Sequence, residues 1–215
     1  MWQAGMAQLL TFFLVSAGVA IGEPQMPVGG FGETLEQAKQ TGFFKWFMLE
    51  QTGESAENGG TKLVFQPSGD RFHDLARVNV KLDGQGHIVG IELALRRDFV
   101  DSSSVGIYAR DIAKSFLQTG VNPQDQESVA NLVSEIDQPK GSSAPVIMHQ
   151  DAVKPAPAGP PSEGYQVYLG KRDAFQVTLP HGQVLNLENK TPDKKTPEDP
   201  KTADKILSLS FRAKS

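Results

Sequence analysis

The 215-residue sequence contains no cysteine. A disulfide, a thiolate zinc site, an acylated lipoprotein cysteine and a cysteine nucleophile are therefore all excluded. An excess of positive charge is also missing, because 21 Lys and Arg residues stand against 25 Asp and Glu residues and give a net charge of −4. A nucleic-acid surface needs a basic face to replace phosphate counterions, so we expect no nucleic-acid partner.

The motifs of the common nucleotide, hydrolase and metal sites are missing too. Residues 29–32 lack the strand-then-helix context of a dinucleotide fingerprint, and residues 59–62 lack the spacing of a P-loop. Neither a Gly-x-Ser-x-Gly elbow nor a His-Glu-x-x-His pair occurs. The four histidines lie far apart, each without a second ligand at metal spacing: His73, His87, His149 and His181. We expect no nucleotide, cofactor or metal.

Charged side chains are absent from residues 1–22, and residues 9–21 form an apolar core of signal-peptide size. Ala20 and Gly22 place small residues where a signal peptidase reads the chain. The segment departs from the pattern by lacking Lys and Arg, and a buried helix or an uncleaved anchor are the alternative interpretations. The apolar run at residues 9–21 is short for a membrane span, which needs about 20 apolar residues, so we interpret 1–22 as a signal peptide.

Residues 76–100 alternate between apolar and polar side chains, which predicts two strands with one buried face. Two glycines between the arms, Gly84 and Gly86, favour a tight hairpin turn. A two-residue loop would place Val80 opposite Val89. Glu92 would lie on the opposite face, where Glu92→Gln should cost less than about 1 kcal/mol.

Helices and strands are predicted along the rest of the chain from periodicity and turn residues. Residues 43–49 concentrate aromatic side chains and form either a helix end or a buried strand; they fit core packing better than a ligand cleft. Residues 51–60 form a polar turn. We expect helices at 34–40, 105–116 and 122–136 and strands at 61–66, 165–169, 174–179, 184–187 and 206–211.

These elements predict an α+β fold, with an antiparallel sheet built on the 76–100 hairpin and two or three helices packed on it. The C-terminal strands are too few and too poor in large apolar residues to fold alone, so they join or overlie this sheet. Residues 23–215 are expected to form a single domain with a proline-rich linker at 139–164 and a mobile loop at 189–204. The strand at 206–211 follows this loop, which suggests a sheet edge open to a partner strand.

The sharpest catalytic candidate is the pair His73 and Asp74, with Glu92 and Asp98 near in sequence. Neighbouring residues on a strand point to opposite faces, so Asp74 is not expected to orient His73, and two polar residues at a strand entrance are the better interpretation. His87 is expected to pack at the hairpin tip. The basic pairs 96–97 and 171–172 are expected to be solvated, and Asn189 begins a glycosylation sequon in the loop.

No catalytic residue is therefore assigned, and whether the chain is an enzyme stays open. We expect an exported, non-catalytic module, periplasmic or secreted, that binds a protein, peptide or envelope component. A small exported hydrolase, with its acid and base assembled only by the fold, is the alternative. Membrane contact is expected only if residues 1–22 stay attached as an anchor.

Overall fold

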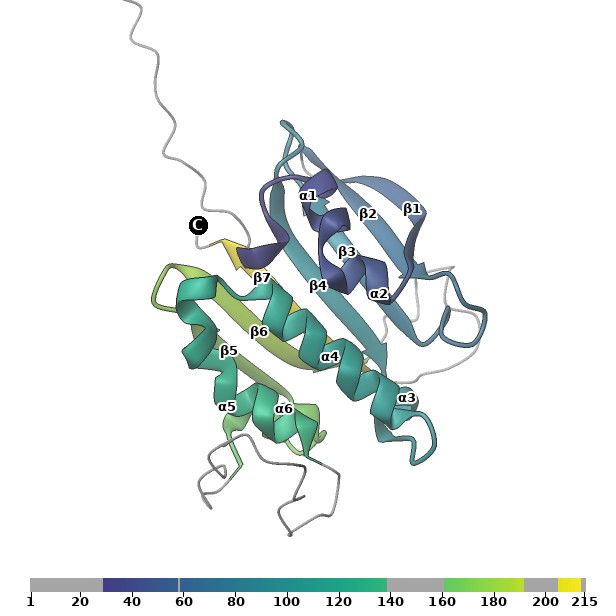
Figure 1. The fold of residues 1–215 in the computed structure, drawn as a ribbon, viewed down its shortest axis with the longest axis vertical. Helices are drawn as coiled ribbons and strands as arrows, with labels where there is room; N and C mark the ends of the chain where they lie inside the picture. Colours follow the sequence, from purple (N-terminus) through teal and green to yellow (C-terminus); the bar gives the residue numbers. More distant parts are fainter. Residues whose placement is uncertain (1–28, 58, 139–160, 192–204, 214–215) are drawn as a thin grey trace, which may run out of the picture.

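The computed structural model describes residues 29–57, 59–138, 161–191 and 205–213 (Figure 1). The strands in this part of the chain are β1 (Leu49–Glu57), β2 (Gly60–Pro67), β3 (Ala76–Leu82), β4 (Ile88–Arg96), β5 (Ala174–Thr178), β6 (Gln183–Lys190) and β7 (Ile206–Ala213). The helices are η1 (Gly29–Phe31), α1 (Leu35–Gln40), α2 (Gly42–Trp46), α3 (Arg97–Asp101), α4 (Gly106–Gly120), η2 (Pro123–Asp125), α5 (Gln126–Asp137) and α6 (Glu163–Tyr168).

The strands form one antiparallel sheet in the order β1-β2-β3-β4-β7-β6-β5. This confirms the predicted α+β fold, in which the C-terminal strands join the sheet. The expected edge position of residues 206–211 is wrong, because β7 pairs with β4 on one side and β6 on the other. The two edges of the sheet are β1 and β5.

The helices lie on one face of the sheet, which we call the helix face (Figure 1). Alternate apolar side chains of the strands point to this face, and both Val80 of β3 and Leu209 of β7 are fully buried there. The Phe116 ring of α4 lies 5.6 Å from the Phe211 ring of β7. A Cβ at Gly120 would lie 2.3 Å from the Phe211 ring, so glycine lets the end of α4 approach the sheet.

The register of the β3–β4 hairpin differs from the prediction. Val80 lies opposite Ile91, and an irregularity beside Leu82 leaves Val89 out of the pairing. The loop is longer than two residues, because the Asp83 N–H donates to the His87 carbonyl at 2.9 Å and leaves residues 84–86 between them. The Asp83 carboxylate also accepts a hydrogen bond from the His87 backbone N–H at 2.8 Å. The alternation itself is confirmed, since the paired apolar residues of β3 and β4 share the helix face.

For several segments the sequence predicted the wrong kind of secondary structure. Residues 51–60, predicted as a turn, lie mostly in β1, whose polar composition suits an edge strand. Residues 165–169, predicted as a strand, belong mainly to α6, because the Ser162 hydroxyl accepts a hydrogen bond from the Tyr165 N–H and caps that helix. The end of the 76–100 stretch forms α3. The helices predicted at 34–40, 105–116 and 122–136 are confirmed as α1, α4, and η2 with α5.

The aromatic segment 43–49 is chiefly the helix α2, capped by Thr41. Phe43 and Phe44 are buried in the core, whereas Trp46 and Met48 are exposed, so core packing is confirmed for part of the cluster. Among the described residues, none belongs to a helix both long and apolar enough to cross a membrane. The signal-peptide segment and most of the two predicted linker regions lie outside the described residues.

The buried face of the hairpin generates a test by substitution. Val80→Asp or Ile91→Asp should unfold the protein, because an unpaired buried charge costs several kcal/mol against a total stability of about 5–15 kcal/mol. Arg77→Ala on the exposed face of β3 should change the free energy of unfolding by less than about 0.5 kcal/mol. Urea denaturation measures all three variants, and equal damage from Arg77→Ala would show that the faces are assigned wrongly.

Candidate functional site

The residues that the sequence offered for catalysis do not form one cluster. His73 Nδ1 does lie 3.1 Å from the Asp74 carboxylate, contrary to the expectation from strand geometry, because both residues lie in a turn before β3. Both side chains are substantially exposed. Asp98 instead forms an ion pair with Arg96, and Glu92 takes part in a separate network on the face of the sheet away from the helices.

A histidine–aspartate pair that sequence reasoning missed joins η2 to the β5–β6 turn. His181 Nδ1 lies 2.7 Å from the carboxylate of Asp125, whose side chain is fully buried. The second carboxylate oxygen accepts the His181 backbone N–H at 3.3 Å. No described residue bonds to the other ring nitrogen. The pair therefore anchors the turn, and separation by 56 residues left no local pattern to reveal it.

The remaining histidines add no site. His87 lies 3.4 Å from the Asp83 carboxylate at the hairpin tip, where its backbone also bridges to Thr34. His149 lies outside the described residues. Within the described ranges, no three His, Asp or Glu residues come close enough to hold a metal ion.

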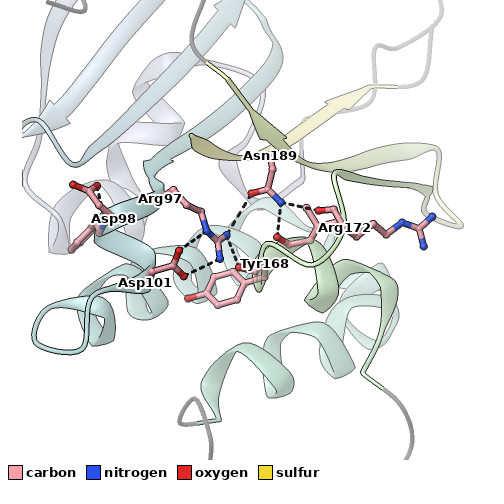
Figure 2. A network of polar contacts seen from close by, with 8 residues as sticks. Arg97, Asp98, Asp101, Tyr168, Arg172 and Asn189 are labelled. Carbon is pink, nitrogen blue, oxygen red and sulfur yellow. Dashed lines mark hydrogen bonds and ion pairs between the residues drawn. The ribbon is translucent and has the colours of Figure 1, made fainter. Parts of the chain in front are cut away.

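Arg97 ties α3, α6 and β6 together (Figure 2). Its guanidinium makes two 2.9 Å hydrogen bonds with the Asp101 carboxylate and donates to the Tyr168 carbonyl at 2.7 Å. A further contact at 3.4 Å reaches the side-chain oxygen of Asn189. The expected solvation of Arg97 is wrong, because only 12% of its side chain is exposed. This network fixes the end of α6 against the sheet.

Asn189 extends this network toward β5. Its side-chain amide donates to the carbonyls of Val167 at 2.9 Å and Arg172 at 2.8 Å (Figure 2). The amide nitrogen that a glycan would modify is thus already engaged on the helix face of β6, not in a loop as expected. Arg172 itself is partly exposed, as the sequence predicted. Asn189 therefore positions the residues that lead from α6 into β5.

A groove of about 200 Å³ lies between α5, the start of α6 and the edge strand β5. Its walls combine apolar side chains with a few polar ones: Ser128, Val129, Asn131, Leu132, Ser162, Gly164, Phe175, Val177 and Leu185. Glu135 holds α5 beside the start of α6, because its carboxylate accepts hydrogen bonds from the backbone N–H and the hydroxyl of Ser162. The groove thus has the helix α5 on one side and a sheet edge on the other.

The backbone of β5 alternates between pairing with β6 and facing away from it. Asp173 accepts a hydrogen bond from the Asn189 N–H, and Leu179 donates one to Gln183, so odd-numbered residues of this strand pair with β6. The N–H and C=O groups of Gln176 and Thr178 consequently point to the open edge. The Arg172 side chain covers one neighbouring edge carbonyl, that of Ala174, at 3.0 Å.

Glu92 has a strongly lowered pKa that follows from its hydrogen-bond partners. Its carboxylate accepts hydrogen bonds from Lys190 at 2.8 Å, from Asn79 at 3.0 Å and from the Ser208 hydroxyl. Burial alone would raise the pKa of Glu92, but the hydrogen bonds and the Lys190 charge lower it from 4.5 to about 2. This lowered pKa predicts a larger contribution of Glu92 to stability than the cost of less than about 1 kcal/mol expected for Glu92→Gln from the hairpin pattern.

No protein-family model, curated protein or solved structure matches this chain, so its function has to be inferred from the geometry of the described residues. Two features stand out from that geometry. One is the groove beside the β5 edge, and the other is the network around Glu92 on the opposite face of the sheet.

The Glu92 network predicts a pH dependence of stability. Because its pKa in the folded state is depressed, the contribution is complete above about pH 4.5 and is lost as the pH falls toward 2. It amounts to about 3 kcal/mol at about 1.4 kcal/mol per pKa unit. We expect Glu92→Gln to remove most of this stability at pH 7 and to flatten the decline between pH 4.5 and 2.

Glu188→Gln is the matched control, because Glu188 faces the same Lys190 at 3.7 Å but is more exposed. Its loss should change the free energy of unfolding by less than about 1 kcal/mol. Denaturant melts of both variants between pH 2 and 7 measure the difference. Indistinguishable curves for the two variants would contradict the role given to Glu92.

Proposed function

We propose that this chain is an exported, non-catalytic binding module that takes an extended peptide segment of a partner protein along the open edge of β5. The observation that carries the proposal is the coincidence of a strand edge that no other described strand pairs with and a groove on the helix face. An added strand gains backbone hydrogen bonds from the edge and specificity from side chains that enter the neighbouring groove.

The edge supports a short and defined pairing. The outward N–H and C=O groups of Gln176 and Thr178 are the donors and acceptors for a partner strand. Since Arg172 covers the carbonyl of Ala174, pairing is expected to centre on residues 176–178. The length of β5, five residues, limits the added strand to about that length.

The groove selects the side chains of the partner. Alternate residues of an added strand point to the same side as Phe175 and Val177, which both line the groove. Val129 and Leu132 of α5 make the opposite wall apolar, and Asn131 adds a polar group. The preferred segment therefore has an apolar residue at every second position, with the residues between them free to vary.

A hydrolase is the less well supported alternative. A second hollow lies beside Glu92 on the opposite face of the sheet. His73, Asp74 and Asp98 line neither this hollow nor the groove, so the clustering that would favour catalysis is lacking among the described residues. His181 and Asp125 have the geometry of an oriented base, with 2.7 Å between ring and carboxylate. They also lie outside both hollows, which favours an anchoring role.

Export is the part of the proposal that rests on sequence alone. The apolar core at residues 9–21 and the small residues Ala20 and Gly22 support cleavage before Glu23 and a periplasmic or extracellular location. A retained segment would instead tether the module to a membrane. The mass of the N-terminus of the protein from its host separates these outcomes.

Selection from a random peptide display library against the folded protein tests the binding function. We expect enriched peptides with apolar residues at alternate positions. Gln176→Pro should weaken their binding about tenfold or more, because proline removes an outward N–H and crowds the edge. Gln176→Ala keeps the backbone donor and should bind like the unaltered protein, which makes it the matched control.

Asn131→Trp gives a second, independent variant, because a large side chain on the exposed face of α5 should block the groove without touching the edge. Thermal unfolding confirms that each variant is folded. Selected peptides that bind Gln176→Pro and Asn131→Trp as well as the unaltered protein would contradict the proposal. A hydrolytic activity abolished by His181→Ala would favour the enzyme instead.

A further inference from the structure

The face of the sheet opposite the helices, which we call the open face, carries more positive than negative charge. Along each strand, the residues between those that point to the helix face point to the open face. Among the described residues, its cations are Lys62, Arg77, Lys81, Arg96, Lys190 and Arg212, and its acids are Glu50, Glu57, Glu92 and Glu188. This excess is local, because the whole chain has a net charge of −4.

Two of these cations flank a glycine in one cross-strand row. Lys81 of β3 pairs with Gly90 of β4, and Gly90 pairs in turn with Arg212 of β7. Neighbouring strands lie about 4.8 Å apart, so the two cationic residues start about 10 Å apart with no side chain between them. Long Lys and Arg side chains can converge from that distance on a small group above Gly90.

A hollow of about 270 Å³ lies at this row. Its lining includes Lys81, Lys190 and Arg212 but only one acid, Glu92. The Glu92 charge is compensated by its hydrogen bonds from Lys190, Ser208 and Asn79. The two cations beside Gly90 therefore dominate the charge available to an occupant.

Lys81 and Arg212 are both accessible to a ligand in the hollow. Lys81 lies 3.3 Å from Glu57, but both side chains are partly exposed, and an exposed ion pair is weak. Arg212 is exposed. Asn79 adds a further polar group to the lining of the hollow. Its side chain is only 8% exposed, and its Oδ1 has no hydrogen-bond partner among the described residues.

We propose that this hollow binds a phosphate group, held between Lys81 and Arg212 above Gly90. A phosphate carries about 1.5 to 2 negative charges at neutral pH and several acceptor oxygens, which suits two converging cations. The planar guanidinium of Arg212 can bind two oxygens at once, and Lys81 adds a point charge. A phosphate that keeps a proton also brings a donor toward the unpartnered Asn79 oxygen.

Calorimetric titration with inorganic phosphate at low salt tests the site. We expect saturable binding that Lys81→Gln and Arg212→Gln each weaken about tenfold. Glu57→Gln should strengthen binding, because it removes the competing partner of Lys81. Gly90→Val keeps every charge but fills the space between the cations, so it should abolish binding.

Arg77→Gln is the matched control, because Arg77 is an exposed cation of the same face that does not line the hollow. It should weaken binding by less than about twofold, the effect of net charge alone. Absence of saturable binding, or equal weakening by Arg77→Gln and Arg212→Gln, would overturn the proposal, as would unchanged binding by folded Gly90→Val.

The same phosphate chemistry occurs on soluble esters and on lipid headgroups. Glycerol 3-phosphate and phosphatidylcholine vesicles containing phosphatidic acid distinguish the two sources. Binding of the ester with competition by inorganic phosphate supports a soluble ligand at this site. Vesicle binding that Gly90→Val abolishes supports a headgroup, whereas vesicle binding that Gly90→Val leaves intact contradicts use of the hollow.

Discussion

The pairing of β7 between β4 and β6 holds the two parts of the sheet together. Without this strand, β1 to β4 and the β5–β6 hairpin would each expose an edge in the middle of the fold. Leu207, Leu209 and Phe211 are fully buried, and the close approach of α4 at Gly120 is built around the Phe211 ring. The groove and the open-face hollow both depend on this arrangement, because β7 positions β6 beside the groove and supplies Arg212 to the hollow.

Sequence patterns predicted the elements that carry their own periodicity. The 76–100 hairpin and the helix α4 each have an apolar face that reads directly from residue spacing. The edge strand β1 was missed because an edge strand with few buried side chains lacks that signal. The helix α6 was missed because its short apolar segment fits either structure, and the Ser162 cap decided between them.

The candidate sites lay beyond sequence reasoning because contacts between distant residues create them. The Arg97 network joins residues 71 positions apart, and the His181–Asp125 pair joins residues 56 apart. The basic pairs 96–97 and 171–172 are visible in the sequence because their residues are adjacent. Lys81 and Arg212 at the hollow become neighbours only through strand pairing across Gly90. Predicting that juxtaposition requires the position of β7, which the sequence misplaced at an edge. The open edge of β5 follows from the same strand order.

Amide hydrogen exchange by NMR tests the binding role of the β5 edge most directly, with and without a peptide selected against the protein. In the free protein, the Gln176 and Thr178 amides should exchange fast, while the Phe175 and Val177 amides, paired with β6, should be protected. If the peptide extends the sheet, Gln176 and Thr178 should gain protection on binding. Binding that leaves these two amides unprotected would contradict the account.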